Sequence, residues 1–383
     1  MKLPIYLDYN ATTPVAPEVA AAIRPWLEDH FGNPSSSHPY GLRARQAVAQ
    51  ARRHVAALIG AQADEIVFTG SATEADNLAL LGIARALGER KRHLVISAVE
   101  HPAIMQPALH LRQLGWDVTI VPVDATGRVV VADVAAALRA DTALVSVMHA
   151  NNEVGTIQPV AEIAAAARAN GTLMHTDAAQ SAGKVTIDVA ALGVDLLTLA
   201  GHKFYAPKGV GALYVRSGVP IQQILFGADQ EHGLRPGTEN VPYLIGFGEA
   251  ARIARAHLPQ AARHLAALRD TLHRRLRDAV PGLMLNGHPE HRLPNTLHVS
   301  FPGVSGRALL AAVADAVAAS VGSACHSDAA AVSGVLAAMG CDAARARGAV
   351  RLSVGMNTTM AEIEKAATVL ADALAQRNAG GRS

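Results

Sequence analysis

The sequence predicts an α/β fold, in which a large domain with a mostly parallel, seven-stranded sheet covered by helices is joined to a smaller α+β domain. Three observations predict it: apolar runs of strand length, helical segments between them, and a change of pattern after about residue 250. A length of 383 residues accommodates both domains. The apolar runs are rich in Val, Ile, Leu and Thr, and several lack polar alternation, which is typical of buried parallel strands. In chain order they are Ile66–Thr69, Leu94–Ala98, Val118–Val121, Leu144–Met148, Thr172–Thr176, Leu196–Leu199 and Val210–Val215.

The segments between these runs consist largely of strong helix formers with apolar residues at helical spacing. They are Glu74–Leu87, Ala103–Leu114, Ala132–Leu138 and Val160–Ala169. After them the sequence predicts a long helix over residues 249–279, an isolated strand over 295–301, a helix, a turn rich in Ser and Gly, and a last helix. We therefore expect a large domain at residues 16–250 and a small domain formed by residues 1–15 and 251–383.

Composition narrows the class of protein. Hydrophobic residues make up 50% of the chain and charged residues 17%, which excludes a disordered chain. A formal net charge of +2 gives no field that would attract nucleic acid or an anionic membrane, so a small-molecule partner is expected. No apolar stretch is long enough for a membrane span, and 2 cysteines cannot form a disulfide framework. These features favour a soluble, cytoplasmic enzyme.

The residues that follow the predicted strands suit one ligand, because the carboxyl ends of parallel strands open on a common crevice. After the first strand, Gly70–Glu74 opens a helix whose free N–H groups suit a phosphate, although an ordinary N-cap at Ser71 or Thr73 is the alternative. After the second strand, His101 stands at the start of the next helix, at the mouth of the same crevice.

Three further strand ends carry polar side chains. Asn151 and Asn152 can bond a ligand's polar edge, and turn formation is the alternative for both. Asp177 ends a buried strand and needs a cationic or donor partner, such as a protonated ring nitrogen. Lys203 lies among apolar and aromatic neighbours, where a lowered pKa would make it a Schiff-base amine. Phosphate, ring nitrogen and aldehyde together describe pyridoxal 5'-phosphate (PLP).

Short motifs support this hypothesis by resemblance. Those of a class V, fold-type I PLP enzyme occur in order as Ser-Ala-Thr-Glu (71–74), Glu-His (100–101), Asn-Asn-Glu (151–153), Asp-Ala-Ala-Gln (177–180) and Gly-His-Lys (201–203). More narrowly, the chain resembles the cysteine desulfurase and selenocysteine lyase family over about residues 1–365. The motifs that carry this are Tyr-Leu-Asp-Tyr-Asn-Ala-Thr-Thr-Pro (6–14), Phe-Gly-Asn-Pro-Ser (31–35), Arg-Pro-Gly-Thr-Glu-Asn (235–240) and Gly-Ser-Ala-Cys-His (322–326).

The resemblance implies roles for individual residues. Lys203 would carry the cofactor as a Schiff base, Asp177 would bond the pyridine nitrogen, and His101 would stack on the ring and relay protons. Asn152 and Gln180 would hold the ring's substituents and the incoming substrate. The implied phosphate contacts are Ala72, Thr73, His202 and, from the neighbouring subunit of a homodimer, Thr238.

The resemblance also implies the reaction. Arg351 would bind the substrate carboxylate, a role that suits a bidentate guanidinium; a surface ion pair is the alternative. Cys325, in a turn of small residues, would take sulfur from L-cysteine as a persulfide and leave L-alanine. Cys341 has no counterpart in the family, and we expect a structural role for it. No histidine pair with metal-ligand spacing occurs among the motif positions, so no metal is expected.

The resemblance leaves alternatives open. A selenocysteine lyase releasing selenium from L-selenocysteine is one, and another class V reaction, a transaminase or epimerase, is a second. A catalytically idle sulfur carrier is a third, and a dinucleotide-binding oxidoreductase lacks its glycine motif. Ala200 stands where relatives often have a serine that contacts phosphate, and the sequence does not identify a sulfur or selenium acceptor protein.

Overall fold

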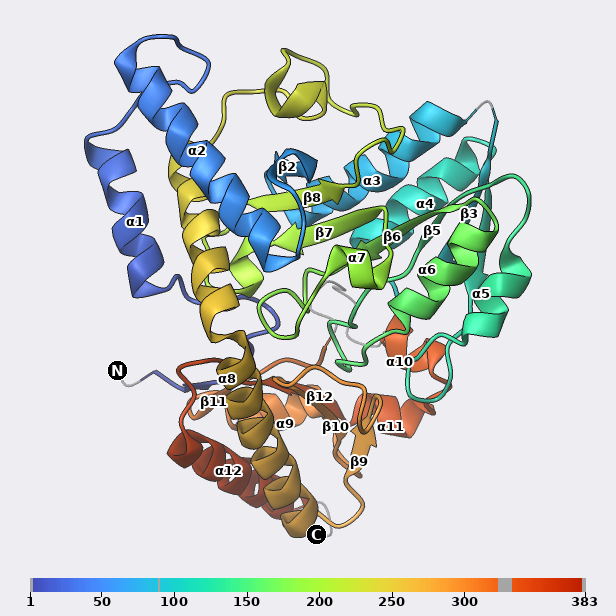
Figure 1. The fold of residues 1–383 in the computed structure, drawn as a ribbon. Coiled ribbons are helices and arrows are strands. Elements are labelled where there is room, and N and C mark those ends of the chain that lie inside the picture. The colour runs from blue at the N-terminus through green and yellow to red at the C-terminus, as the bar shows by residue number, and fades with distance from the viewer. Residues whose placement is uncertain (1–2, 89, 323–332, 381–383) are drawn as a thin grey trace.

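The computed structural model describes residues 3–88, 90–322 and 333–380, and within them a seven-stranded sheet forms the centre of the larger lobe (Figure 1). Its strands are β2 (Ile66–Thr69), β3 (His93–Ser97), β4 (Asp117–Val121), β5 (Thr142–Ser146), β6 (Leu173–Asp177), β7 (Leu196–Ala200) and β8 (Gly211–Val215). Their spatial order is β2-β8-β7-β6-β5-β3-β4. Strands β3 to β7 pair in parallel, whereas β8 is antiparallel to β7 and β2. The predicted fold class is confirmed, and every predicted strand is present with ends displaced by at most 2 residues.

Helices cover both faces of the sheet (Figure 1). One face packs against α2 (Pro39–Leu58), α5 (Val131–Ala137), α6 (Val160–Ala169), α7 (Val189–Leu192) and the first part of α8 (Val241–Ala279), with α1 (Pro17–Glu28) behind them. The opposite face packs against α3 (Ala72–Leu87) and α4 (Pro102–Gln113). Val95 points into the first layer while Leu94 and Ile96 point into the second, so both faces of a strand are apolar. That is why the strands have nearly continuous apolar sequences.

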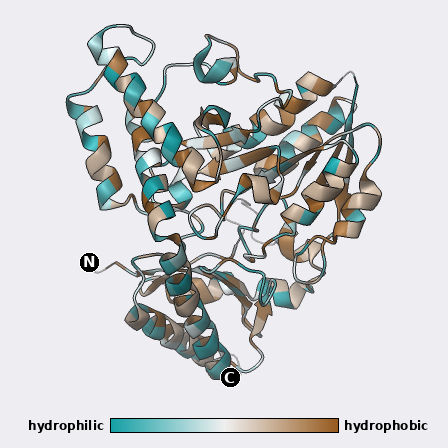
Figure 2. Ribbon diagram, viewed as in Figure 1, coloured by the Kyte–Doolittle hydropathy of each residue, from teal (hydrophilic) through white to brown (hydrophobic). Residues whose placement is uncertain are grey.

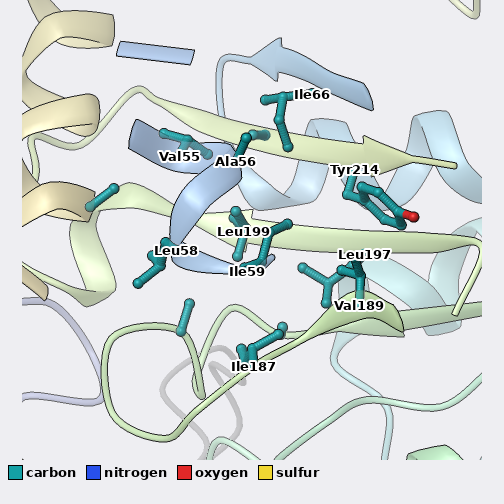
Figure 3. Packing of buried hydrophobic residues seen from close by; sticks show 14 of the residues in the cluster. Val55, Ala56, Leu58, Ile59, Ile66, Ile187, Val189, Leu197, Leu199 and Tyr214 are labelled. Atoms are coloured by element: carbon teal, nitrogen blue, oxygen red, sulfur yellow. The ribbon is translucent and has the colours of Figure 1, made fainter. Parts of the chain in front are cut away.

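The packing on the α2 face is seen closely in Figure 3, where Ile59, just after the end of α2, lies beside Leu199 of β7, and Val55 and Leu197 belong to the same cluster. Val55, Ile59, Leu197 and Leu199 are all 0% exposed. Figure 2 shows the same division over the whole molecule, with hydrophobic colour along the strands and mixed colour on the surrounding helices. Burial on this scale holds the strand ends, and the side chains that they carry, in fixed positions.

A smaller lobe lies below the large sheet in Figure 1 and has its own antiparallel sheet. Its strands, in the order β12-β10-β9, are β12 (Ala349–Ser353), β10 (Thr296–Ser300) and β9 (Met284–Asn286). The expected strand over 295–301 is β10, but its two partners were not predicted. The remaining helices of the described chain here are α9 (Gly306–Ala312), α10 (Gly334–Ala338), α11 (Ala343–Arg347) and α12 (Met360–Gly380).

The N-terminal segment joins the smaller lobe. Strand β1 (Ile5–Tyr6) pairs in parallel with β11 (Val317–Ala318), and the Ser353 N–H of β12 donates to the carbonyl oxygen of Leu7 at 2.7 Å. Among the described residues, three short 3-10 helices complete the elements: η1 (Ala63–Glu65), η2 (Gly201–Lys203) and η3 (Gln230–Gly233).

Helix α8 connects the two lobes. It begins earlier than the predicted residue 249, because Asn240 caps it and Pro242 occupies its first turn, both of which are helix-start signals. Phe247 belongs to the core of the large lobe, whereas Leu272 belongs to the core of the small one. The expected boundary at residue 250 therefore falls inside one continuous helix, and the division into two domains stays a prediction.

Candidate active site

A cavity of about 330 Å³ lies where residues at the ends of β6 and β7 meet residues of β12 and of the N-terminal segment. It brings together nine residues that the sequence analysis singled out: Ala72, Thr73, His101, Asn152, Asp177, Gln180, His202, Lys203 and Arg351. Of the described residues proposed for the site, Thr238 does not line this cavity; it is exposed between η3 and α8. Cys325 lies outside the described residues.

The first turn of α3 forms one wall of the cavity. Ser71 is the N-cap of α3, and its Oγ accepts a hydrogen bond from the Glu74 N–H at 3.1 Å. The alternative prediction, an N-cap at Ser71, is therefore correct. Ala72 and Thr73 nevertheless line the cavity, and first-turn N–H groups have no acceptor within their own helix. A Cβ on Gly211 of β8 would come within 2.6 Å of the Ser71 backbone, so glycine allows the close approach of strand and helix. This wall is suited to an anion.

Lys203 is the last residue of η2, the short helix that directly follows β7. Its Nζ donates to the backbone carbonyl oxygens of Asn10 and Ala11, the latter at 2.9 Å. The preceding His202 pairs through Nδ1 with the Thr12 hydroxyl at 3.1 Å. Burial, reinforced by the positive charge of Lys203, lowers the pKa of His202 to about 4, so its ring is neutral at pH 7. The cavity therefore contains an amine beside a neutral imidazole.

Asp177 is the last residue of β6. One carboxylate oxygen accepts from the Ala179 N–H at 2.8 Å. Burial raises the pKa of Asp177, while that hydrogen bond, the charge that His101 carries when it is protonated, and the charge of Lys203 oppose the rise. Such a carboxyl group is best stabilised as an anion by a cationic donor brought into the cavity.

His101 is the N-cap of α4. Its Nδ1 accepts from the Ala103 N–H at 3.1 Å, so the neutral ring carries its proton on Nε2. Burial lowers the pKa of His101, although Asp177 acts in the opposite direction. The ring on the cavity wall is thus a neutral imidazole. To accept a proton, it must either break the hydrogen bond at Nδ1 or first give up the proton on Nε2.

Arg351, in the middle of β12, connects three segments. Its Nη1 donates to the carbonyl oxygen of Asn152 at 2.9 Å, and its Nη2 donates to Asp8 Oδ1 at 2.8 Å. The side chain is buried, and its Nε has no hydrogen-bond partner among the described residues. Arg351 is therefore no surface ion pair, and its guanidinium lies on the cavity wall.

Among the lining residues with polar side chains, two were not singled out from the sequence. The Asn10 carbonyl oxygen accepts from Lys203 Nζ and from Gln180 Nε2, while Asn10 Nδ2 donates to Thr296 Oγ1 at 2.8 Å. Asn10 thus joins the amine-bearing loop to the small sheet. Its only signal in the sequence was membership of the 6–14 motif.

Asp76 is the second such residue. It lies one helical turn beyond Thr73, on the same face of α3, and its carboxyl group is fully buried. His175 Nε2 lies 3.7 Å from Asp76 Oδ1, but burial lowers the pKa of His175 to about 3, so this histidine is not a counter-ion at pH 7. Burial, together with repulsion from Asp177, raises the pKa of Asp76 well above its usual value. Of the two neighbouring carboxyl groups, Asp177 therefore carries a negative charge more readily than Asp76.

Glu100, beside the site, supports a first testable prediction. Its Oε1 accepts from the Ser97 hydroxyl and from the Met148 N–H, and burial raises its pKa to about 8. The folded-state pKa lies above the unfolded value of about 4.3, so the bound proton stabilises the fold fully below about pH 4, and this contribution is lost as the pH rises through about 8. The glutamine of Glu100→Gln resembles the protonated glutamate side chain but does not titrate. This variant should therefore not lose folding stability as the pH rises.

We expect the melting temperature of the Glu100→Gln apoprotein, relative to wild type, to rise by several degrees between pH 4 and pH 8 and then to level off. Thermal unfolding followed by circular dichroism measures this difference. Glu290→Gln, at an exposed position, is the matched control and should show no such trend. A difference that is constant across this pH range would contradict the assignment.

The cavity fits PLP. A helix N-terminus suits its phosphate, an amine suits its aldehyde, a buried carboxyl group suits its pyridine nitrogen, and the Arg351 guanidinium on the cavity wall suits a substrate carboxylate. Its volume lies in the usual range of about 300–1,000 Å³ for small-molecule sites. This fold and this cavity define a PLP-dependent enzyme of fold type I.

The comparison with known sequences gives the family. The family model for aminotransferase class-V matches residues 5–366. The chain belongs to this family, and the predicted family and cofactor are confirmed.

Individual relatives cover nearly the whole chain. It is 43% identical to "Cysteine desulfurase IscS" of Dictyoglomus turgidum over 97% of this chain and 94% of the relative. It is 46% identical to "Cysteine desulfurase IscS" of Anaeromyxobacter dehalogenans over 96% of this chain and 91% of the relative. A solved structure of a NifS-like protein superposes with a TM-score of 0.92 and 37% identity, and the match covers 98% of this chain and 100% of that one. No helix in the described ranges has the length and apolar character to cross a membrane.

Proposed function

We propose that the chain is a PLP-dependent cysteine desulfurase, which converts L-cysteine to L-alanine and transfers the sulfur to Cys325. The observation that carries this proposal is the shared cavity, in which Lys203, Asp177 and Arg351 come together from separate segments. The cysteine desulfurase names of relatives with 43–46% identity support the choice of substrate.

Each wall of the cavity would hold one part of the cofactor. The first turn of α3 and His202 would bind the phosphate, and Lys203 Nζ would bond the aldehyde carbon. Asp177 would pair with the pyridine nitrogen, and His101 would lie against the ring. When bound, PLP supplies an electron sink for charge that develops at the substrate's Cα.

The chain's own residues would move the proton. Lys203 Nζ would take the proton from the substrate's Cα, and His101 would be the second group that can relay it, after its Nε2 proton has been given up. The neutral state of the His101 ring agrees with either role. Asp177 would have to stay ionised throughout, and the raised pKa of the neighbouring Asp76, caused by its burial and by Asp177, favours this.

The proposed acceptor of sulfur is Cys325. Gly322 lines the cavity, and Cys325 follows it by three residues in the sequence. The Cys325 thiolate would attack the substrate sulfur, so that the Sγ–Cβ bond of L-cysteine breaks, a sulfur–sulfur bond forms, and protons complete alanine. The products, L-alanine and a Cys325 persulfide, then contain all the atoms of L-cysteine and the free thiol. Persistence of that free thiol favours the cytoplasm.

Arg351 would bind the substrate carboxylate, and its replacement gives a second prediction. Arg351→Lys keeps the charge but loses the guanidinium fork, so KM for L-cysteine should rise on the order of 100-fold while kcat falls less. Steady-state assays of alanine formation measure both constants. Arg345→Lys is the matched control, because Arg345 makes similar hydrogen bonds to Asn286 and Leu285 in the same lobe, away from the cavity. Unchanged KM in Arg351→Lys would rule out this role.

We also propose a homodimer. Thr238 is exposed and lies outside the cavity of its own subunit, which agrees with a contact to the phosphate site of a second copy. Sedimentation of the purified protein should give the mass of two chains. A monomer that retains full activity would contradict the contribution of Thr238.

The function is tested by incubating the purified, PLP-loaded protein with L-cysteine and a thiol reductant. We expect equal amounts of L-alanine and sulfide. L-selenocysteine is assayed in parallel, because it is the alternative substrate. Transamination or racemisation of amino acids without sulfide release would overturn the proposal in favour of another class V reaction.

A further inference from the structure

A second buried lysine lies beside the site and has no place in the proposed mechanism. Lys184 lies four residues beyond Gln180 and is 6% exposed. Its Nζ donates to the Gln180 carbonyl oxygen at 2.9 Å and to Gln180 Oε1 at 3.1 Å. No carboxylate of the described residues lies within 4.0 Å of it, which is unusual because buried lysines are normally paired with an acid.

The environment of Lys184 is electropositive. Burial lowers its pKa well below the usual value, and the nearby charges of Lys203 and Arg351 lower it further. A lysine kept in such a place costs stability, so its two hydrogen bonds to one glutamine call for an explanation.

These hydrogen bonds fix the orientation of the Gln180 carboxamide. At one end, Lys184 Nζ donates to Oε1. At the other end, Nε2 donates to the backbone carbonyl oxygen of Asn10 at 3.0 Å, and a carbonyl oxygen can only accept. The amide therefore cannot be turned over without losing both contacts. Nε2 has two N–H groups and gives one to Asn10, so the second remains for the cavity that Gln180 lines.

We propose that Lys184 is a positioning residue that holds the Gln180 amide with an N–H, and not the carbonyl oxygen, toward the ligand. The ligand atom at this place must then be a hydrogen-bond acceptor. On the basis of the proposed function, it is the anionic ring oxygen of PLP beside the aldehyde carbon. A hydrogen-bond donor stabilises the negative charge of that oxygen most when the neighbouring Lys203 nitrogen is unprotonated. The donor therefore lowers the pH at which the Lys203 nitrogen loses its proton.

The test uses Lys184→Met, which keeps the length and apolar volume of the side chain but has no donor. We expect the PLP affinity, measured by fluorescence titration of the apoprotein, to fall about tenfold. We also expect the pH midpoint of the cofactor's visible absorbance change to rise by about one unit. Lys365→Met, at an exposed position on α12, is the control and should match wild type in both measurements.

A second variant keeps the test decisive if Lys184→Met does not fold. Gln180→Glu retains an oxygen for Lys184 but replaces the amide donor with a second oxygen, and we expect the same direction of change in affinity and midpoint. A purely structural role of Lys184 would lower the melting temperature without moving the midpoint. An unmoved midpoint and affinity in folded Lys184→Met, or in Gln180→Glu, would overturn the inference. Failure of the wild-type protein to bind PLP would instead refute the proposed function.

Discussion

Replacing Lys203 by alanine is expected to lower the rate of L-alanine formation from L-cysteine by about 10³-fold or more, because the amine has two tasks. It would anchor the cofactor, and it would take the Cα proton. Its Nζ donates hydrogen bonds to the carbonyl oxygens of Asn10 and Ala11 of the N-terminal segment, which hold it at the cavity wall. An alanine assay on protein supplemented with PLP measures the loss.

The matched control is Lys208→Ala. Lys208 is exposed and follows Lys203 by five residues in the same loop region, so its removal tests the effect of losing a positive charge nearby. It should retain activity close to wild type. A Lys203→Ala protein with turnover within tenfold of wild type would show that another amine does this work, and Lys184 would be the first to examine.

Replacing Cys325 by alanine is expected to abolish sulfur transfer and to lower L-cysteine turnover by on the order of 100-fold or more, because the thiolate is the nucleophile that removes sulfur. Turnover of L-selenocysteine should be partly retained, since selenolate leaves more readily than thiolate. Parallel assays of alanine with the two substrates measure this split.

Cys341 supplies the control for this variant. It is partly buried beside Leu336 and Met339, and burial raises its pKa, which is typical of a structural thiol. Cys341→Ala should keep both activities. Full retention of cysteine turnover in Cys325→Ala would refute the persulfide mechanism and favour another class V reaction.

Much of the large sheet could be predicted because its strands are buried on both faces. Runs such as Leu94–Ala98 and Leu196–Leu199 are apolar except for one small hydroxyl residue in each, and polar residues follow where each one reaches the crevice. Asp177 and Lys203 were found in this way, by their position after such runs. The structure places both on one cavity, as strand ends in a parallel sheet require.

The smaller sheet was less predictable. Strand β12 contains Arg351, a charged residue that makes the run look unlike a buried strand. The charged side chain of Arg351 can be buried because the Asp8 carboxylate and the Asn152 carbonyl oxygen accept its hydrogen bonds. These partners come from segments far apart in the chain, so the role of Arg351 followed from the resemblance alone.

Asn10 and Lys184 were missed for the same kind of reason. Each acts through a backbone carbonyl or a side-chain amide of another segment, and no local pattern in the sequence reports such contacts. Asp76 had a local signal, since it lies on the same helical face as Thr73, but a carboxyl group on a helix is normally solvated. Its complete burial beside Asp177 became evident only in the folded chain.

The central claim, that the cavity binds PLP through Lys203, is tested most directly by peptide mass mapping of the PLP-loaded protein after borohydride reduction. The reduction fixes the cofactor to the amine that holds it. We predict a phosphopyridoxyl group on the peptide containing Lys203 and none on the peptide containing Lys184. Modification of Lys184 or of another lysine in place of Lys203, or a loaded protein that carries no such group, would contradict this account.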